Sequence, residues 1–341
     1  MIKRSQLFSV KNILLAVAAI LLMLLPAGTQ NSFIISTMIM TFTFGALGVS
    51  WNLIGGYGAQ VSWCHAAFVA IGGYSGFICY NYLGISPFIS MFVGMFLSFL
   101  TSTIIGYGAF RLRGFYFSLS TIAFAEIVRI ILLYFRGFTG GASGMYITFK
   151  EVSFAALTFR KDTPFYYICF GLMVVTLIIT YMFERSKTGY YLGAIKGDED
   201  AATSLGIKTF KVKLSAFQIS AVLTSVIGTI YAFYLTYLEP TSICGMDLSV
   251  RIGVVAIVGG LGFMWGPVLG AFVVIPATQI VSYYWGHIGG ASQMVYGLLL
   301  ILVVIFRPNG LISFFSKKKS GDHSTLIKTI SGITSKKEEM K

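Results

Sequence analysis

The chain has 341 residues, of which 56% are hydrophobic and only 11% carry a charged side chain. Because an ordinary soluble domain carries roughly 25% charged residues, this composition excludes most classes of soluble protein. A net charge of +13 would indicate a nucleic-acid partner if the chain were soluble. Here the basic residues lie between long apolar blocks and in the tail, so we expect no nucleic-acid partner and interpret the charge as a record of membrane orientation.

Long apolar blocks determine the expected fold class. About 20 apolar residues span a lipid bilayer as a helix, whereas a membrane β-barrel would show short alternating segments, which this sequence lacks. We therefore expect an all-α, polytopic helical membrane protein. Its transmembrane domain is expected over residues 1–312. A basic tail over residues 313–341 is expected to be disordered or to lie on the anionic inner leaflet.

The first apolar block, Ile13–Leu25, follows a basic N-terminal segment. Its length fits a signal peptide, but no clear small-residue cleavage pattern follows it, so we expect a retained first helix. Further blocks lie at Ser32–Ile54, Ser62–Leu83, Ser86–Phe110, Phe115–Phe135, Pro164–Phe183 and Leu214–Leu238. The series ends with a long glycine-broken stretch, Arg251–Trp285, and a last block, Gln293–Phe306.

The basic segments predict the topology, because cytoplasmic loops carry an excess of Lys and Arg. With the basic N-terminus inside, the blocks bring Arg111 and Arg113 inside, Arg136–Thr163 outside and the basic segment Glu184–Lys213 inside. The lysine-rich tail also belongs inside, so Arg251–Trp285 must contribute an even number of crossings. It forms either two short spans or a re-entrant hairpin, which predicts about ten spans, or about eight plus a hairpin.

Glycine clusters interrupt the helical pattern in two places. Gly55–Gly58 followed by Trp63 is similar to Gly259–Gly262 followed by Trp265. This echo is either the trace of a duplicated unit, as in many transporters, or a result of the abundance of glycine, which lets helices approach closely. The residues expected to break the helices are Gly58, Gly259, Gly260, Gly262, Gly266 and Pro267.

The sequence lacks the common motifs of catalysis. It has no phosphate-binding loop of the type GxxxxGK[ST], no HExxH metal motif and no GxSxG nucleophile turn. The cysteines are widely separated and form no CxxC pair, so they are interpreted as packing residues. We expect no enzyme activity, metal or cofactor in this chain. The remaining functional class is a transport pore or a subunit of one.

The loop Glu184–Lys213 holds a capped helix in its middle. Asp198 is a good N-cap, and Glu199 and Asp200 place negative charge in the first turn, where the helix dipole favours it. Gly206 follows at a position where helices often end. A helix this short is unstable alone, so it either docks on a partner surface or is an ordinary connecting loop.

Glu126 and Arg129 are charges inside an apolar block. They lie three residues apart and therefore share a helix face. At 1.5 Å per residue, Glu126 is roughly 17 Å from Phe115, close to the middle of the bilayer. Ionised residues at this depth are costly and usually functional. The pair either lines the solute pathway or holds helices together.

Polar residues also begin the block after the first glycine cluster. Gln60, Ser62 and His65 either line a water-filled pathway or form hydrogen bonds between helices. The candidate residues of the translocation pathway are Gln60, Ser62, His65, Thr121, Glu126 and Arg129.

Several stretches, in order, carry a resemblance to a known family. They are Tyr57–Phe68, Arg111–Arg129, Thr139–Gly141, Glu184–Gly206, Gly259–Gly270 and Tyr296–Leu311. In these stretches the chain resembles the M-type permease subunit of branched-chain amino acid (LIV-type) ABC importers. It departs from the family at Ala59, where glycine is usual, at Cys64, where glycine is frequent, and at Tyr190, where a basic residue is common.

The resemblance implies a heteromeric importer in the inner or plasma membrane. Such a machine contains two related permeases, two cytoplasmic ABC ATPases that bind ATP and magnesium, and an external solute-binding protein. It also implies that the coupling contact with the ATPases lies in Glu184–Gly206. The residues assigned to that contact are Gly189, Asp198, Glu199, Asp200, Ala201, Ala202, Leu205 and Gly206.

The expected function is import of branched-chain amino acids, driven by ATP that partner subunits hydrolyse. Importers of urea and short amides use similar permeases, so the solute stays open. A stand-alone channel, a secondary transporter or a structural membrane scaffold are the rival classes. The N-terminus and the tail are expected on the cytoplasmic side.

Overall fold

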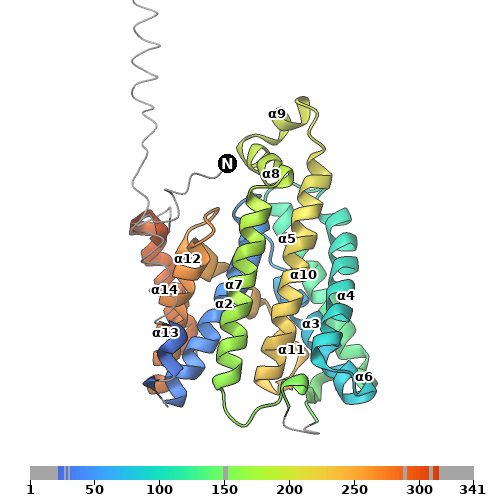
Figure 1. Ribbon diagram of the computed structural model, residues 1–341. Coiled ribbons are helices and arrows are strands. Elements are labelled where there is room, and N and C mark those ends of the chain that lie inside the picture. The colour runs from blue at the N-terminus through green and yellow to red at the C-terminus, as the bar shows by residue number, and fades with distance from the viewer. Residues whose placement is uncertain are drawn as a thin grey trace, which may run out of the picture.

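The computed structural model describes residues 22–26, 28, 29, 31–148, 153–286, 290–306 and 310–314. These residues form a bundle of long helices (Figure 1). Its first half consists of α2 (Ser32–Gly55), α3 (His65–Leu83), α4 (Pro87–Ala109), α5 (Phe115–Tyr134), α6 (Arg136–Thr139), η2 (Gly141–Ser143), β1 (Met145–Tyr146), η3 (Phe154–Ala156) and α7 (Thr163–Glu184).

The second half begins with two short helices between α7 and α10. It consists of α8 (Lys187–Gly197), α9 (Glu199–Ser204), α10 (Thr209–Leu235), β2 (Tyr237–Leu238), α11 (Pro240–Ile243), α12 (Met246–Gly259), α13 (Gly266–Trp285), α14 (Ala291–Phe306) and η4 (Leu311–Phe314). The predicted basic tail, residues 313–341, lies outside the described residues except for its first two positions.

The polytopic helical class is confirmed, but the predicted number of about ten spans is not. Within the described part of the chain, 7 helices are long and apolar enough to cross a membrane: α2, α4, α5, α7, α10, α13 and the segment Pro240–Gly259 that contains α11 and α12. Helix α3 is mostly buried among other helices, so it tolerates polar residues such as His65 and Asn81. The apolar part of α14, Gln293–Leu302, is shorter than a span. The first predicted block, Ile13–Leu25, lies mostly outside the described residues.

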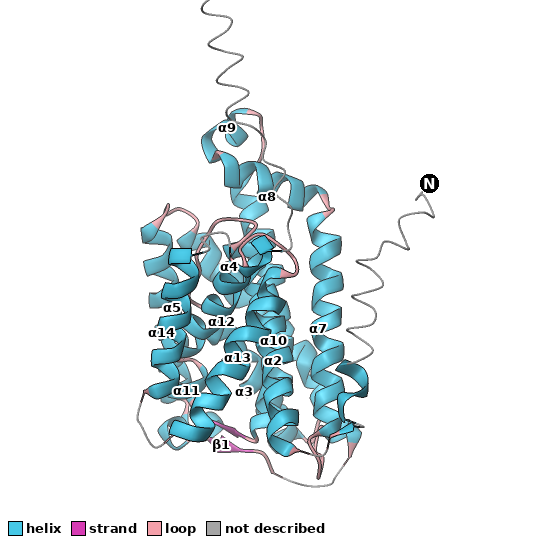
Figure 2. Ribbon diagram, turned by 90° about the vertical axis from the view of Figure 1, so that its left-hand side faces the viewer, coloured by secondary structure: helices cyan, strands magenta, loops and turns pink. Residues whose placement is uncertain are grey.

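The two ends of the bundle differ in structure. Helices α8 and α9 cap one end, which we call the α8–α9 end, and the short strands lie at the other, which we call the hairpin end (Figure 2). Strands β1 and β2 are antiparallel, with Met145 opposite Leu238 and Tyr146 opposite Tyr237. They join the long connection between α5 and α7 to the end of α10.

Helix α10 lies at the centre of the bundle and packs against α2, α3 and α4. Its approach to α3 depends on glycine in both helices. A methyl group on Gly72 would lie 2.0 Å from the carbonyl oxygen of Ser225, and one on Gly228 would lie 2.5 Å from that of Val69. Because any side chain here would strike backbone, the two helices touch along their main chains, as is common in membranes.

The glycine-broken stretch falls into two helices separated by the break. Helix α12 starts inside the bundle, after α11, and ends at Gly259, and α13 starts at Gly266 and runs back. The break therefore lies where the sequence predicts it, and both Pro240–Gly259 and α13 are long and apolar enough to be spans. The first of these helices starts before Arg251, the predicted beginning of the stretch.

We expect Gly72→Ala to weaken the α3–α10 contact, because the added methyl group meets the Ser225 carbonyl. Overpacking of this kind costs about 1–3 kcal/mol. The matched control is Gly171→Ala on α7, where nothing lies within 4 Å of the added atom. Thermal unfolding of the detergent-solubilised protein measures the effect, and equal midpoints for the two variants would contradict the close packing.

Candidate functional site

Helix α8 folds back across the end of α7, and Gly189 makes this turn feasible. The Ser186 hydroxyl accepts the Gly189 N–H at 3.2 Å and so caps α8. A methyl group on Gly189 would lie 2.4 Å from the carbonyl oxygen of Phe183. The sequence predicted one short helix in this loop, but there are two, because the residues interpreted as a basic linker form α8.

Helix α9 is the capped helix that the sequence predicts. The Asp198 carboxylate accepts the N–H groups of Asp200 and Ala201, both at 2.9 Å. At the other end Gly206 has φ +85, and its N–H donates to the Thr203 carbonyl at 2.9 Å. These contacts satisfy backbone groups that a free helix end would leave unpaired.

One face of α9 is buried and the other is open. Ala202 is 3% exposed, whereas Leu205, just after the helix, is 83% exposed. Ala201 is exposed as well. The open face thus presents one apolar side chain, Leu205, to the outside of the bundle. The coupling role of the assigned residues stays a prediction.

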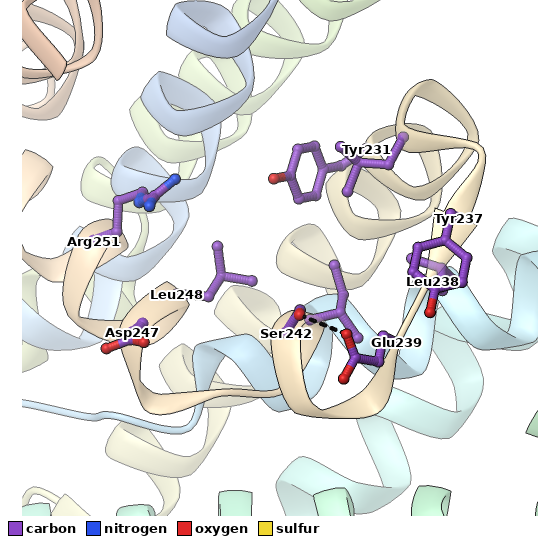
Figure 3. Close-up of a pocket in the computed structure, with 10 residues that line it drawn as sticks. Tyr231, Tyr237, Leu238, Glu239, Ser242, Asp247, Leu248 and Arg251 are labelled. Atoms are coloured by element: carbon purple, nitrogen blue, oxygen red, sulfur yellow. Dashed lines mark hydrogen bonds between the residues drawn. The ribbon is translucent and has the colours of Figure 1, made fainter. Parts of the chain in front are cut away.

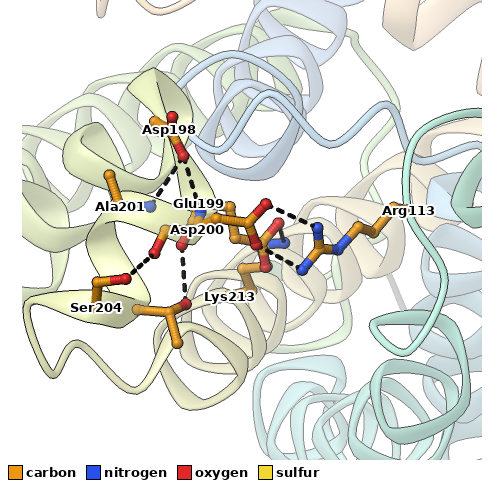
Figure 4. Close-up of polar contacts among 8 residues, drawn as sticks. Arg113, Asp198, Glu199, Asp200, Ala201, Ser204 and Lys213 are labelled. Carbon is orange, nitrogen blue, oxygen red and sulfur yellow. Dashed lines mark hydrogen bonds and ion pairs between the residues drawn. The ribbon is translucent and has the colours of Figure 1, made fainter.

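Two ion pairs join α9 to the long helices (Figure 4). Glu199 binds Lys213 of α10 at 2.6 Å, and the Lys213 side chain is 3% exposed. Asp200 binds Arg113, in the turn between α4 and α5, through two hydrogen bonds of 2.9 and 3.2 Å. This contact raises the pKa of Arg113, chiefly through the hydrogen bond and then through the charge of Asp200. The buried Glu199–Lys213 pair holds α9 more firmly than the exposed one.

Helix α8 lies over the two predicted glycine breaks, which contact each other. The Asn52 side-chain amide donates to the Phe263 carbonyl at 3.0 Å and accepts the Gly262 N–H at 2.9 Å. The Lys196 ammonium donates to the Gly56 carbonyl at 2.8 Å. A methyl group on Gly56 would lie 2.5 Å from the Gly262 nitrogen. The breaks therefore form one joint beneath α8.

Tyr57 adds a contact between this joint and the end of α7. Its hydroxyl donates to the Glu184 carboxylate at 3.3 Å. Burial, followed by the charge and hydrogen bond of Glu184, raises the pKa of Tyr57 well above its usual range. The phenol therefore stays protonated and remains a donor.

The structure buries part of the predicted translocation pathway in the helix core. Ser62 and His65 are 0% exposed, so neither faces open space. The His65 Nε2 atom lies 2.8 Å from the Ser220 hydroxyl of α10. Ser220 also donates to the Ser50 carbonyl of α2 at 2.7 Å. These bonds link α2, α3 and α10, as the helix-bonding alternative predicts.

Gln60 and Thr121 lie close to that core. Gln60 is half-buried in the connection between α2 and α3. Thr121 is fully buried and accepts the Trp63 N–H at 3.0 Å, which fastens α5 to this connection.

Glu126 and Arg129 form an ion pair with each other on α5. Their side chains are 49% and 27% exposed, respectively. Ser62, His65 and Thr121 are thus buried while Glu126 and Arg129 are partly exposed, and the role of these residues in transport stays a prediction.

Sequence reasoning missed one charged residue, Arg251, which it used only as the edge of a block. Arg251 lies on α12, with its guanidinium 5.6 Å from the ring centre of Phe44 and 5.0 Å from that of Tyr296. The available signal was an isolated cation within an apolar segment, which indicates a functional site by default.

The described residues contain no group of three or more His, Cys, Asp or Glu side chains that could hold a metal ion. The four cysteines are buried and unpaired, as expected for packing residues.

Comparison with known proteins gives one family match. The branched-chain amino acid transport system / permease component family matches residues 31–304. The high-affinity branched-chain amino acid transport system permease protein LivM of Salmonella typhimurium is 26% identical, over 83% of this chain and 70% of its own. LivM of Escherichia coli is 26% identical, over 80% and 68%. The ribose import permease protein RbsC of Haemophilus influenzae is 27% identical over 40% of this chain and 43% of its own. No solved structure matches.

We expect Gly189→Ala to displace α8 from the end of α7, because the methyl group meets the Phe183 carbonyl. Gly193→Ala on the same helix is the control, since nothing lies within 4 Å of its added atom. Limited trypsin digestion measures the effect as faster cleavage near Arg185 and Lys187. Equal cleavage rates in both variants would show that α8 does not need glycine at this turn.

We expect Glu199→Gln to loosen α9, because it leaves the buried Lys213 ammonium without its carboxylate. An unsatisfied buried charge costs about 2 kcal/mol. Asp200→Asn, which breaks the exposed pair, serves as the comparison and is expected to change little. Hydrogen exchange of the α9 amides measures the opening free energy, and equal protection in both variants would contradict the greater strength of the buried pair.

Proposed function

The chain belongs to the branched-chain amino acid transport permease family, and from this premise we propose that it is the membrane-spanning subunit of an ATP-binding-cassette importer. It carries branched-chain amino acids across the bacterial inner or plasma membrane, using ATP that partner subunits hydrolyse. The observation that supports this most is α9, a capped helix with Leu205 exposed at its end and ion pairs to two transmembrane elements.

The proposed assembly contains a second permease of similar fold, two cytoplasmic ABC ATPases and an external solute-binding protein. ATP and magnesium bind to the ATPases, because this chain has no phosphate-binding loop. The lipid bilayer surrounds the described helices that are long and apolar enough to span it.

The charge distribution supports a cytoplasmic position for the α8–α9 end. Basic residues gather there: Arg111, Arg113, Arg185, Lys187, Lys196, Lys208, Lys211 and Lys213. At the hairpin end the described basic residues are Arg136, Arg160 and Lys161. Because cytoplasmic loops carry excess positive charge, the hairpin end faces outward. The N-terminus and the tail then lie in the cytoplasm.

The proposed mechanism transmits movement of the ATPases through α9. An ATPase bound at Leu205 displaces α9 when it moves. The Glu199–Lys213 ion pair transmits this displacement to α10, and the Asp200–Arg113 ion pair transmits it to the α4–α5 turn. Helix α8 moves with α9 and acts on the glycine joint through Lys196. The helices then rock between outward-facing and inward-facing states, as in other alternating-access transporters.

The rival function is a stand-alone channel or secondary transporter. Gradient-driven flux through the chain alone in liposomes, without any ATPase, would favour that rival. Urea and short amides remain the alternative solutes of the importer.

We expect Leu205→Asp to uncouple the importer, because a charge replaces the apolar anchor. Loss of a central anchor in an interface costs 2 kcal/mol or more, so ATP-driven uptake is expected to fall about tenfold or more. The control is Leu83→Asp, at an equally apolar position that is 67% exposed at the hairpin end. Uptake is measured in proteoliposomes that contain the whole complex. If both variants import at the wild-type rate, α9 is not the coupling element.

A further inference from the structure

A cavity of about 360 Å³ opens at the hairpin end, outside the residues assigned to coupling or the pathway (Figure 3). Its walls come from the end of α10, strand β2, α11 and the first turns of α12. The lining residues used below are Arg251, Glu239, Asp247, Leu235, Leu238 and Leu248. The volume lies in the range of small-molecule sites, about 300–1,000 Å³.

Arg251 supplies a cation without an anionic partner. No carboxylate of the described residues forms an ion pair with it. Its Nε atom is buried and, among the described residues, has no hydrogen-bond partner. Aromatic rings on one side of the guanidinium, Phe44 and Tyr296, shield it from water but cannot neutralise it. Arg251 is half-buried, and an unpaired charge within an apolar segment is costly, which an anionic ligand group would offset.

Carboxylates lie at two other points of the same cavity. Glu239 is on the side opposite Arg251, where it accepts hydrogen bonds from the hydroxyls of Ser242, at 3.1 Å, and Thr241. Asp247 is exposed in the first turn of α12, one turn before Arg251. The cavity thus offers a cationic point and anionic points that are separated from each other.

Aliphatic side chains line the space between these charges. Leu235, Leu238 and Leu248 contribute to the wall, and the last two are nearly fully buried. A ligand that fits has one anionic group, one cationic group and an aliphatic body. Neutral amides and sugars lack the anion that Arg251 needs.

We propose that this cavity binds an aliphatic α-amino acid in its zwitterionic form as it enters the permease from the outer side. The α-carboxylate binds the Arg251 guanidinium, the ammonium faces the acidic side of the cavity formed by Glu239 and Asp247, and the branched side chain contacts the leucines. This inference rests on the proposed import function and assigns its solute class to particular residues.

The decisive test uses the assembled importer in proteoliposomes with ATP, its binding protein and radiolabelled leucine. Arg251→Gln is expected to lower the initial uptake rate about tenfold or more, because a charge-assisted hydrogen bond is lost. Arg251→Lys keeps the charge and is expected to retain part of the rate. The matched control is Arg160→Gln, which removes an exposed cation at the same end outside this cavity.

Glu239→Gln provides a second variant at the rim, which is expected to fold even if Arg251→Gln does not assemble. It is expected to slow leucine uptake, whereas Asp162→Asn, an exposed acid at the same end, keeps the wild-type rate. ATP hydrolysis stimulated by the loaded binding protein is expected to persist in Glu239→Gln, which separates a binding defect from failed assembly.

The outcomes distinguish a wrong assignment of the cavity from a wrong proposal of the import function. If the wild-type importer moves leucine, and Arg251→Gln and Glu239→Gln take it up as fast as their controls, the cavity does not bind the solute. The proposed import function then still stands. A wild-type importer that moves urea or ribose and not leucine overturns the proposed solute, and the cavity assignment with it.

Discussion

The contact between the two glycine breaks is the constraint on which the arrangement of α2, α3, α12 and α13 depends. Buried backbone that leaves a helix must have its polar groups satisfied by protein or water. The Asn52 side chain meets this need for the second break by bonding both Gly262 and Phe263. Only glycine fits at Gly56, because any side chain would strike Asn52 or the Gly262 backbone. The ends of α2 and α12 are therefore held side by side.

The same contact connects the proposed coupling region with the proposed solute cavity. Helix α12 ends at the joint that Lys196 of α8 contacts, and begins at the cavity with Arg251. Helix α10 carries Lys213, which binds α9, close to its first residue, Thr209, and ends beside the cavity with Tyr231 and Leu235. Both helices run from the coupling region to the proposed solute site. A movement at α9 can thus change the cavity without any flexible link between them.

Local patterns in the sequence predicted much of the structure of the proposed coupling element. Asp198 and Gly206 act on backbone groups only a few residues away. Their roles as the N-cap and the end of α9 could therefore be predicted from the sequence. Helix α8 was missed because its basic residues resembled a linker, and its turn on α7 depends on space at Gly189. Ser62, His65 and Thr121 were recognised as special, but their burial depends on which helices surround them.

The sequence by itself determined the helical membrane class, the order of the apolar blocks, the places where glycine breaks them and the family. These follow from composition, periodicity and short motifs, which act locally. Only the tertiary structure decided that Gly56 meets Gly262 and that Arg251 faces a cavity opposite Glu239. These facts depend on which helix faces meet across the bundle, and residues far apart along the chain set that choice.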